Sequence, residues 1–217
     1  MTQVLNKTER TRLRRAHPRG HYDVETIHAI LDAQPMCHLA YVVDGSPICM
    51  PTIQWREGGR VYWHASSAGR GIQAALGAEV CLTVSILDGL ILARSAMHHS
   101  VNFRSVLVFG QPEAIEDPDV KKEKLGNLID HLYPGRNEFL RPMTDQEIKA
   151  TAVLSMPIDE ASAKIRTGGP KDDEADYALP IWAGVLPVSM SVGEAIPDPR
   201  NLDGVERPKH LDAVKLG

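Results

Sequence analysis

Residues 58–84, GGRVYWHASSAGRGIQAALGAEVCLTV, decide how the rest of the chain is interpreted. A Gly-Gly turn opens the stretch, and residues 60–64 then alternate in the manner of a short β-strand. Ser66 and Ser67 end that strand, and both suit the N-cap of a helix whose apolar residues follow at helical spacing. Residues 80–84 read as a second strand. The predicted order is therefore strand, polar loop, short helix, strand.

The polar loop in this stretch has the composition of a site for a phosphate-sized anion. A helix N-terminus offers unpaired N–H groups, Ser66 and Ser67 offer hydroxyls, and Arg70 adds a guanidinium in the first turn. The loop is neither a Walker loop nor a G-x-G-x-x-G motif. A capped surface helix with a solvated arginine explains the same residues, because caps need no ligand. Taken alone, the loop leaves both interpretations open.

The composition of the chain excludes several classes of protein. With 217 residues, 43% of them hydrophobic and 24% charged, the chain is an ordinary globular protein, large enough for one sizeable domain. A net charge of −4 gives no general case for nucleic-acid binding. No apolar run approaches the roughly 18–20 residues of a membrane span, and the N-terminus lacks the hydrophobic part of a signal peptide. We therefore expect a cytoplasmic protein that binds neither nucleic acid nor membrane.

The three cysteines, Cys37, Cys49 and Cys81, all lie in apolar strand-like runs without a C-x-x-C pair. We expect reduced, buried thiols.

Strands dominate the chain after a first helix. Asp23 can cap that helix, which ends at Gln34-Pro35, and the strands at residues 36–43 and 47–55 flank a hairpin turn at Asp44-Gly45. Further strands are expected at residues 90–94, 103–109, 111–116 and 152–158. Strands joined by short turns predict an antiparallel barrel or sandwich, mainly β with flanking helices (α+β).

Helices return later, and both ends of the chain are polar. Asp117-Pro118 begins one helix, and Thr144 with Glu147 forms a capping box for another. Residues 167–176 read as a flexible loop and residues 179–192 as a Pro-broken edge strand or ordered loop. The expected organisation is a basic arm at residues 1–22, one domain at 23–195 and a tail at 196–217. The arm could bind phosphate or nucleic acid, but a solvated tail is the favoured interpretation.

The histidines and serines form no recognisable catalytic motif. His98 and His99 are adjacent, and neighbours on a strand point to opposite faces, so they cannot share one metal. No other histidine has metal-ligand spacing with them, and no G-x-S-x-G is present. We therefore expect no metal site, and we expect a bound cofactor to carry any chemistry.

Three segments resemble a known family. Residues 61–70 (VYWHASSAGR), 102–110 (NFRSVLVFG) and 180–184 (PIWAG) resemble the pyridoxamine 5′-phosphate oxidase-like family of FMN-binding split β-barrels, especially its nitroimidazole-resistance branch. Their order and separation match across residues 23–195. The resemblance favours the anion-site interpretation of the serine and arginine loop.

The resemblance implies a homodimer of split β-barrels with FMN at the subunit interface. The strand at residues 102–109 is apolar on both faces, so a twofold copy is expected to cover one of them, facing either Val106 or Val108. The resemblance implies FMN contacts from several parts of the chain. Met50, Pro51, Thr52 and Ile53 would lie along the flavin ring, with Trp63 and His64 beside it. Ser66, Ser67 and Arg70 would hold the phosphate, and Ser105 would reach the flavin from the partner chain. Arg104 and Trp182 complete the implied FMN-binding residues.

The end of the chain limits the function that the resemblance implies. It lacks the Arg-x-His-x-Arg segment of true pyridoxamine phosphate oxidases, so vitamin B6 oxidation is the weaker alternative. We expect an FMN-dependent oxidoreductase that reduces a small electrophile with NAD(P)H. His64 would be its catalytic residue, as proton donor or substrate contact, unless it only packs against the flavin. The other alternative is a non-catalytic module for flavin, deazaflavin or haem, with His64, His98 or His99 as axial ligand.

Overall fold

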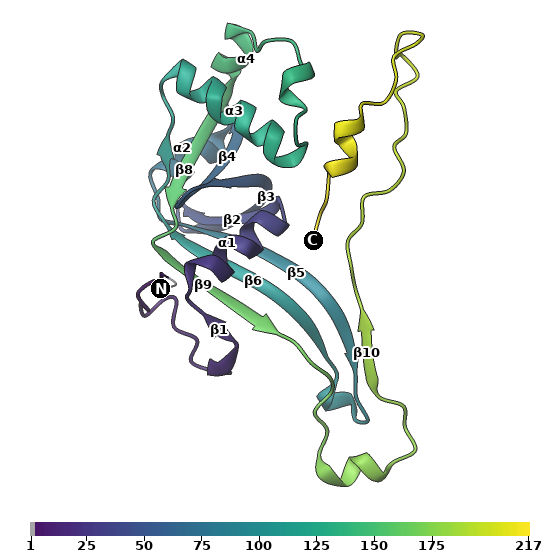
Figure 1. Cartoon of the computed structure of the whole chain (residues 1–217). Helices are drawn as coiled ribbons and strands as arrows, with labels where there is room; N and C mark the ends of the chain where they lie inside the picture. Colours follow the sequence, from purple (N-terminus) through teal and green to yellow (C-terminus); the bar gives the residue numbers. More distant parts are fainter. Residues whose placement is uncertain (1–2) are drawn as a thin grey trace.

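Two consecutive strands at opposite ends of the sheet give the fold its shape (Figure 1). In the computed structural model, which describes residues 3–217 except the side chains of Arg70 and Gln73, β8 (Thr151–Pro157) and β9 (Glu160–Arg166) are separated by two residues. The strand order is β1-β9-β6-β5-β2-β3-β4-β8-β7, with β10 on β5.

Six strand spacings of about 4.8 Å would put β8 and β9 roughly 29 Å apart in a flat sheet, whereas three residue steps reach only about 10 Å. The sheet therefore curls until its two ends meet. Because β8 and β9 are not paired with each other, the barrel is split, which confirms the predicted fold.

The barrel wall is built from antiparallel hairpins. β2 (Met36–Val43) and β3 (Ser46–Glu57) meet at Asp44 and Gly45, whose φ values of 48° and 78° suit a tight hairpin turn. β4 (Arg60–Ser66) follows. β5 (Val80–Leu92) and β6 (Ser100–Gly110) are long, and with β10 (Gly184–Pro187) they extend beyond the barrel as a ribbon. The sheet also contains β1 (Gly20–His21) and β7 (Glu113–Ala114).

The sequence predicted two strands where the structure has β5 alone. A register shift between Leu87 and Gly89 lets one strand continue. A Cβ at Gly89 would lie 3.1 Å from Val185 Cγ1 and 3.2 Å from Leu186 O, so glycine permits the close approach of β10. The residues between the two predicted strands therefore form a bulge within one strand rather than a break.

Hydrophobic cores lie on both sides of β4. Val61 and Trp63 belong to the barrel interior, which α1 (Val24–Ala33) also fills. Tyr62 belongs to a second core beneath α3 (Pro118–Leu132) and α4 (Asp145–Ala150). Figure 1 shows these two helices over β4 and β8. α2 (Arg70–Leu76) contributes Ile72 to the barrel core.

The N-terminal arm is not the solvated tail that the sequence favoured. Thr11 is 1% exposed, and the Tyr22 hydroxyl donates to its carbonyl at 3.0 Å. Arg10 forms ion pairs with Glu79 and Glu160. Most residues of the arm are exposed, but these contacts tie the arm to Tyr22 and to the start of β9.

Three local expectations were wrong. Val106 and Val108 both lie in the barrel core at 0% exposure, so neither faces a partner; Leu107, at 37%, points outward. Gly69, not a serine, is the N-cap of α2. Cys49 is exposed, because it lies on the outer face of β3.

The C-terminal segment leaves the sheet and returns to it (Figure 1). The Val188 amide donates to Asp88 O, and the Gly217 amide donates to Ala33 O at 2.9 Å. On the way back, the ring of His210 stacks on Phe139, with 4.8 Å between ring centroids. The short 3-10 helices of the chain are η1 (His17–Arg19), η2 (Ala96–His98), η3 (Asn137–Phe139), η4 (Glu174–Ala178) and η5 (Lys209–Ala213).

Over the described residues, no helix has the length and apolar character that crossing a membrane requires.

Candidate cofactor site

The alternation of β4 directs His64 away from the barrel interior. His64 pairs with Val153 of β8, which lies in the second core. Because directly opposite residues of an antiparallel pair share a face, His64 points to the side covered by α3 and α4. Its neighbour Trp63 points into the barrel and is 1% exposed.

A cavity of about 500 Å³ opens beside His64. This volume falls within the range of roughly 300–1,000 Å³ typical of small-ligand sites. Its walls come from β4, α3, α4, the start of β8 and the segment between the two helices. They are mainly apolar: His64, Leu125, Leu128, Ile129, Leu140, Arg141, Met143, Glu147, Ile148 and Thr151.

The imidazole of His64 is the unsatisfied polar group of this cavity. Nδ1 is buried and has no hydrogen-bond partner among the described residues. Burial lowers the pKa of His64, so the ring is neutral at neutral pH. A neutral imidazole with a free nitrogen can ligate a metal or accept a hydrogen bond, and leaving it unpaired is costly.

Charged groups lie only at the rim of the cavity. Arg141 donates to Glu147 at 3.0 Å, and Glu147 also accepts from the backbone amide of Thr144 in the capping box of α4. These hydrogen bonds, that from Arg141 foremost, lower the pKa of Glu147 to about 2. The rim therefore presents a fixed guanidinium beside an apolar interior.

The strand predicted to run along a flavin ring presents two different faces. Pro51 and Ile53 lie on the outer face of β3, and Ile53 packs against the second core, as His64 does. Met50 and Thr52 pair with Leu39 and Cys37, two residues of the barrel core, and share their face. Within one chain, Pro51, Ile53 and His64 therefore share a face, whereas Met50, Thr52 and Trp63 point the other way.

The predicted phosphate loop follows directly after β4. Ser66 and Ser67 are exposed, and the Ser67 amide donates to Ala150 O at 2.9 Å. Arg70 begins α2, but its side chain lies outside the described part of the structure. Phosphate binding by these three residues stays a prediction.

The remaining predicted residues lie on or beside the ribbon. Arg104 is paired with Asp88 at 2.8 Å, and the Ser105 hydroxyl donates to Lys164 O at 3.4 Å. Trp182 is 67% exposed. Arg104 lines a different cavity, which shares no wall residue with that of His64. One chain therefore does not bring these residues to His64.

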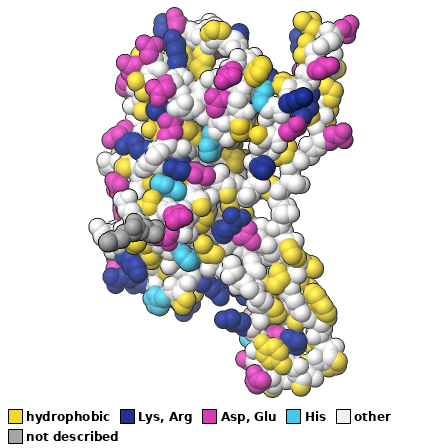
Figure 2. Space-filling view, in the orientation of Figure 1, with side chains coloured by type: hydrophobic (Ala, Val, Ile, Leu, Met, Phe, Trp, Pro, Cys, Tyr) yellow, Lys and Arg dark blue, Asp and Glu magenta, His cyan; other side chains and the backbone are white. Residues whose placement is uncertain are grey.

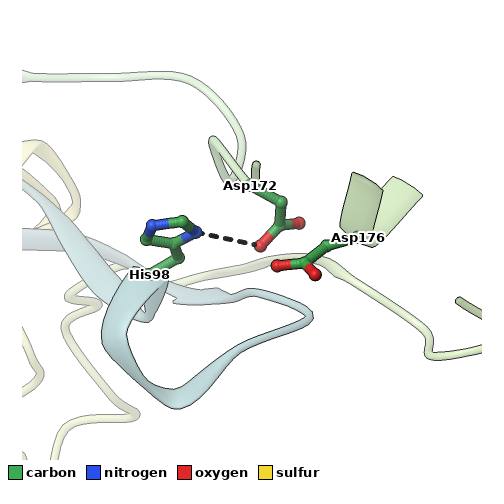
Figure 3. A group of neighbouring side chains, drawn as sticks. All are labelled: His98, Asp172 and Asp176. Atoms are coloured by element: carbon green, nitrogen blue, oxygen red, sulfur yellow. Dashed lines mark ion pairs between the residues drawn. The ribbon is translucent and has the colours of Figure 1, made fainter. Parts of the chain in front are cut away.

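A group at the far end of the ribbon has the residue types of a metal site (Figure 3). Ligand atoms of His98, Asp172 and Asp176 lie within 4.8 Å of one another. The side chain of Asp172 has no exposed area and accepts hydrogen bonds from the Arg94 amide and Nη1 at 3.0 and 2.9 Å. The guanidinium of Arg94 already neutralises the carboxylate of Asp172, so this carboxylate is poorly suited to binding a metal cation as well. The group therefore serves to hold the loop after β9 against η2.

Comparison with known proteins identifies the family. The sequence profile described as pyridoxamine 5′-phosphate oxidase matches residues 23–165. The chain belongs to the pyridoxamine 5′-phosphate oxidase family. This confirms the resemblance that the three sequence segments carried. Among curated proteins, none matches the chain.

Solved structures of this family extend the likeness beyond the profile. The flavocytochrome Anf3 from Azotobacter vinelandii is 52% identical, with a TM-score of 0.94 over 97% of this chain and 98% of that one. The FAD and haem binding protein from Mycobacterium smegmatis is 32% identical, with a TM-score of 0.87 over 91% and 97%. A protein from Bacteroides thetaiotaomicron assigned to 5-nitroimidazole resistance is 23% identical, with a TM-score of 0.56 over 66% and 84%, and shows the shared fold.

Several residues of the His64 cavity were not found from the sequence. In the sequence, Leu125 and Leu128 fit the apolar side of the helix that begins at Asp117-Pro118, a pattern typical of any packed helix. Arg141 and Glu147 lie about 80 residues after His64, and the folding of α3 and α4 over β4 brings them together. The capping box identified Glu147, but as a helix start rather than a cavity rim.

Proposed function

We propose that this protein is a homodimeric redox protein that binds a flavin and a haem, with His64 as an iron ligand. The observation that carries the proposal is the free imidazole of His64 at an apolar cavity of about 500 Å³. The 52% identical relative is a flavocytochrome, and the 32% identical relative binds FAD and haem.

The residues of the cavity fit a haem. Histidine is a common axial ligand of haem iron, and apolar walls exclude water from a porphyrin. Arg141 at the rim is suited to a carboxylate of the haem edge. The other two candidate histidines fit less well. His98 lies 3.6 Å from the carboxylate of Asp172, and His99 is exposed with Nδ1 2.9 Å from Ser95 O.

A flavin is expected on the outer face of the barrel wall. This face carries small or uncharged side chains on neighbouring strands, including Ala40, Thr83, Ser85 and Leu107. On β5 and β6 this face is uncharged, and charges begin only with Glu160 and Lys164 on β9. Its uncharged part suits a twofold copy of the chain, which would bring Ser105 of one protomer to a flavin held near Arg70 of the other. The flavin is FMN in the family resemblance and FAD in the Mycobacterium relative.

When bound, a flavin and a haem would supply the chemistry that passes the two electrons of a hydride donor, such as NAD(P)H, onward one at a time. His64 would hold the iron, and the apolar residues of α3 and α4 would exclude water. The depressed pKa of His64 argues against the alternative role of proton donor, because the ring carries no extra proton at neutral pH. A cytoplasmic location completes the proposal.

The test compares the absorption spectra of purified protein and a His64→Ala variant, both supplied with haem. The wild-type protein should show a Soret band as well as flavin bands, and His64→Ala should lose the Soret shift of ligated haem while keeping its flavin. His99→Ala is the matched control and should resemble wild type. An unchanged haem spectrum in His64→Ala contradicts the assignment. Chromatography of the released flavin distinguishes FMN from FAD.

A further inference from the structure

A second cavity lies where the N-terminal arm meets the end of β9. Its volume is about 560 Å³. Its charged or titratable wall residues are Arg19, His21, Arg166 and Lys171, and in the described part of the chain none of its wall residues is acidic. In Figure 2, Lys, Arg and His side chains gather at the lower left of the molecule, where the arm lies.

Arg166 is the buried charge of this cavity. The residue is 8% exposed, and Nη1 donates to the amide oxygen of Asn102 at 2.9 Å. Within residues 3–217, no carboxylate forms an ion pair with Arg166. Burial, and then the charge of Arg19, lower the pKa of its guanidinium. A buried cation beside another cation is unfavourable unless an anion compensates it.

The loop opposite Arg166 is held in place by the same asparagine. Asn102 Nδ2 donates to Gly168 O at 3.0 Å, so one buried amide joins the guanidinium to the segment Thr167-Gly-Gly-Pro-Lys171. Gly168 has φ +95°, a conformation that favours glycine. Gly169 lines the cavity without a side chain, which lets a ligand approach the backbone.

Acidic residues close to the wall residues in space or in sequence are engaged elsewhere. Asp23 accepts a hydrogen bond from the Thr26 amide at 2.8 Å as the cap of α1, and this bond, with a smaller contribution from the charge of His21, lowers the pKa of Asp23. Asp172 follows Lys171 directly, but its carboxylate accepts from Arg94. Glu160 at the start of β9 is paired with Arg10 of the arm. The cationic side chains of the cavity therefore give it a positive electrostatic potential, which favours the binding of an anion.

We propose that this cavity binds the phosphate groups of a nucleotide, with Arg19, Arg166 and Lys171 facing a diphosphate. Guanidinium groups match phosphate oxygens in geometry and charge. The volume leaves room for a nucleoside beside the phosphates. Two sources share this chemistry: the diphosphate of a flavin dinucleotide held by the same protein, and a free nucleotide such as a nicotinamide dinucleotide. The proposal does not depend on the haem assignment.

The test is calorimetric titration of the purified full-length protein with pyrophosphate, ADP and adenosine. We expect pyrophosphate and ADP to bind and adenosine not to bind. Arg19→Gln and Arg166→Gln should each weaken binding roughly tenfold or more, as expected for one charge-assisted contact. Arg12→Gln is the control, because it removes the same charge from an exposed arm residue that does not line the cavity. If Arg166→Gln fails to fold, Arg19→Gln alone decides, since Arg19 is only partly buried.

Repeating the titration after removal of the flavin separates the two sources. Binding with flavin in place supports a free nucleotide. Pyrophosphate binding that appears only after the flavin is removed, together with loss of flavin from the Arg19→Gln variant, supports the diphosphate of a flavin dinucleotide as the natural occupant. Absence of pyrophosphate binding in both forms, or an equal loss in Arg12→Gln, overturns the proposal.

Discussion

Leu107 and Val108 are neighbours on β6 that test the proposed dimer face, because their side chains point to opposite sides of the barrel wall. Leu107 is 37% exposed and Val108 is fully buried. Leu107→Asp places its charge on the outer face, where a monomer tolerates it within about 0.5 kcal/mol of unfolding free energy. Val108→Asp buries a carboxylate in the barrel core at a cost of several kcal/mol, against a total stability of about 5–15 kcal/mol.

The same Leu107→Asp charge is costly in a twofold dimer. Symmetry brings two copies into one interface, so an interface penalty of about 2–3 kcal/mol per carboxylate doubles to about 5 kcal/mol. This corresponds to roughly 10³-fold weaker association or more. Analytical ultracentrifugation at micromolar concentration should show a folded monomer with reduced flavin content. Val120→Asp, an exposed change on α3, should remain dimeric.

Two results would refute this reasoning. A Leu107→Asp protein that stays dimeric with full flavin would show that this face is not the interface. A Leu107→Asp protein that unfolds as Val108→Asp does would show that Leu107 is part of the core.

Three further predictions concern stability. The side-chain amide of Gln54 donates to the carbonyls of Leu31 and Gln34 at 2.6 and 2.9 Å. Gln54→Leu leaves both carbonyls without this donor and should lower the free energy of unfolding, measured in urea, by about 2–4 kcal/mol. A decrease below about 0.5 kcal/mol would contradict this. Thr144→Ala removes the side-chain cap of α4. It should lower the free energy of unfolding by about 1 kcal/mol, and the Tm measured by calorimetry by about 2–4 °C. An unchanged Tm would show that the cap does not stabilise the protein. The folded-state pKa of His64 is depressed, so the unfolded state binds more protons in acid. Cofactor-free protein should therefore lose stability as pH falls below about 6.5, and His64→Ala should lose less over the same range.

The sequence predicted the elements whose signals are local. The Asp44-Gly45 turn, the Asp23 and Asp117 caps and the Thr144 capping box each involve residues within a few positions of one another, and all are present. The β9 strand was missed, because its buried positions are filled by alanines, a serine and an arginine, which give little hydrophobic contrast. Likewise, the alternation of β6 was clear, but which of its faces is the core depends on the curl of the whole sheet.

The candidate site was only partly predictable for a related reason. His64 was found through a motif shared with relatives, whereas the cavity beside it depends on two helices about 55 to 85 residues later in the chain. The basic arm was recognised as a charge cluster. Arg166, which lines the same cavity as Arg19 of the arm, lies about 150 residues later in the sequence and belongs to no such cluster. Hydrophobic periodicity describes one element at a time, so it does not show which charged residues a tertiary fold brings together.

The adjacency of β8 and β9 in the sequence has a consequence for protein synthesis. β4 pairs with β8, and β6 pairs with β9. One edge of β4 and one edge of β6 therefore stay unpaired until residues 151–166 have been synthesised. A nascent chain emerging at about 5–20 residues per second therefore carries two open strand edges for several seconds after its hairpins have formed. Open edges recruit other chains. We expect the nascent protein to be most prone to aggregation just before these sixteen residues leave the ribosome, and most dependent on chaperones at that moment.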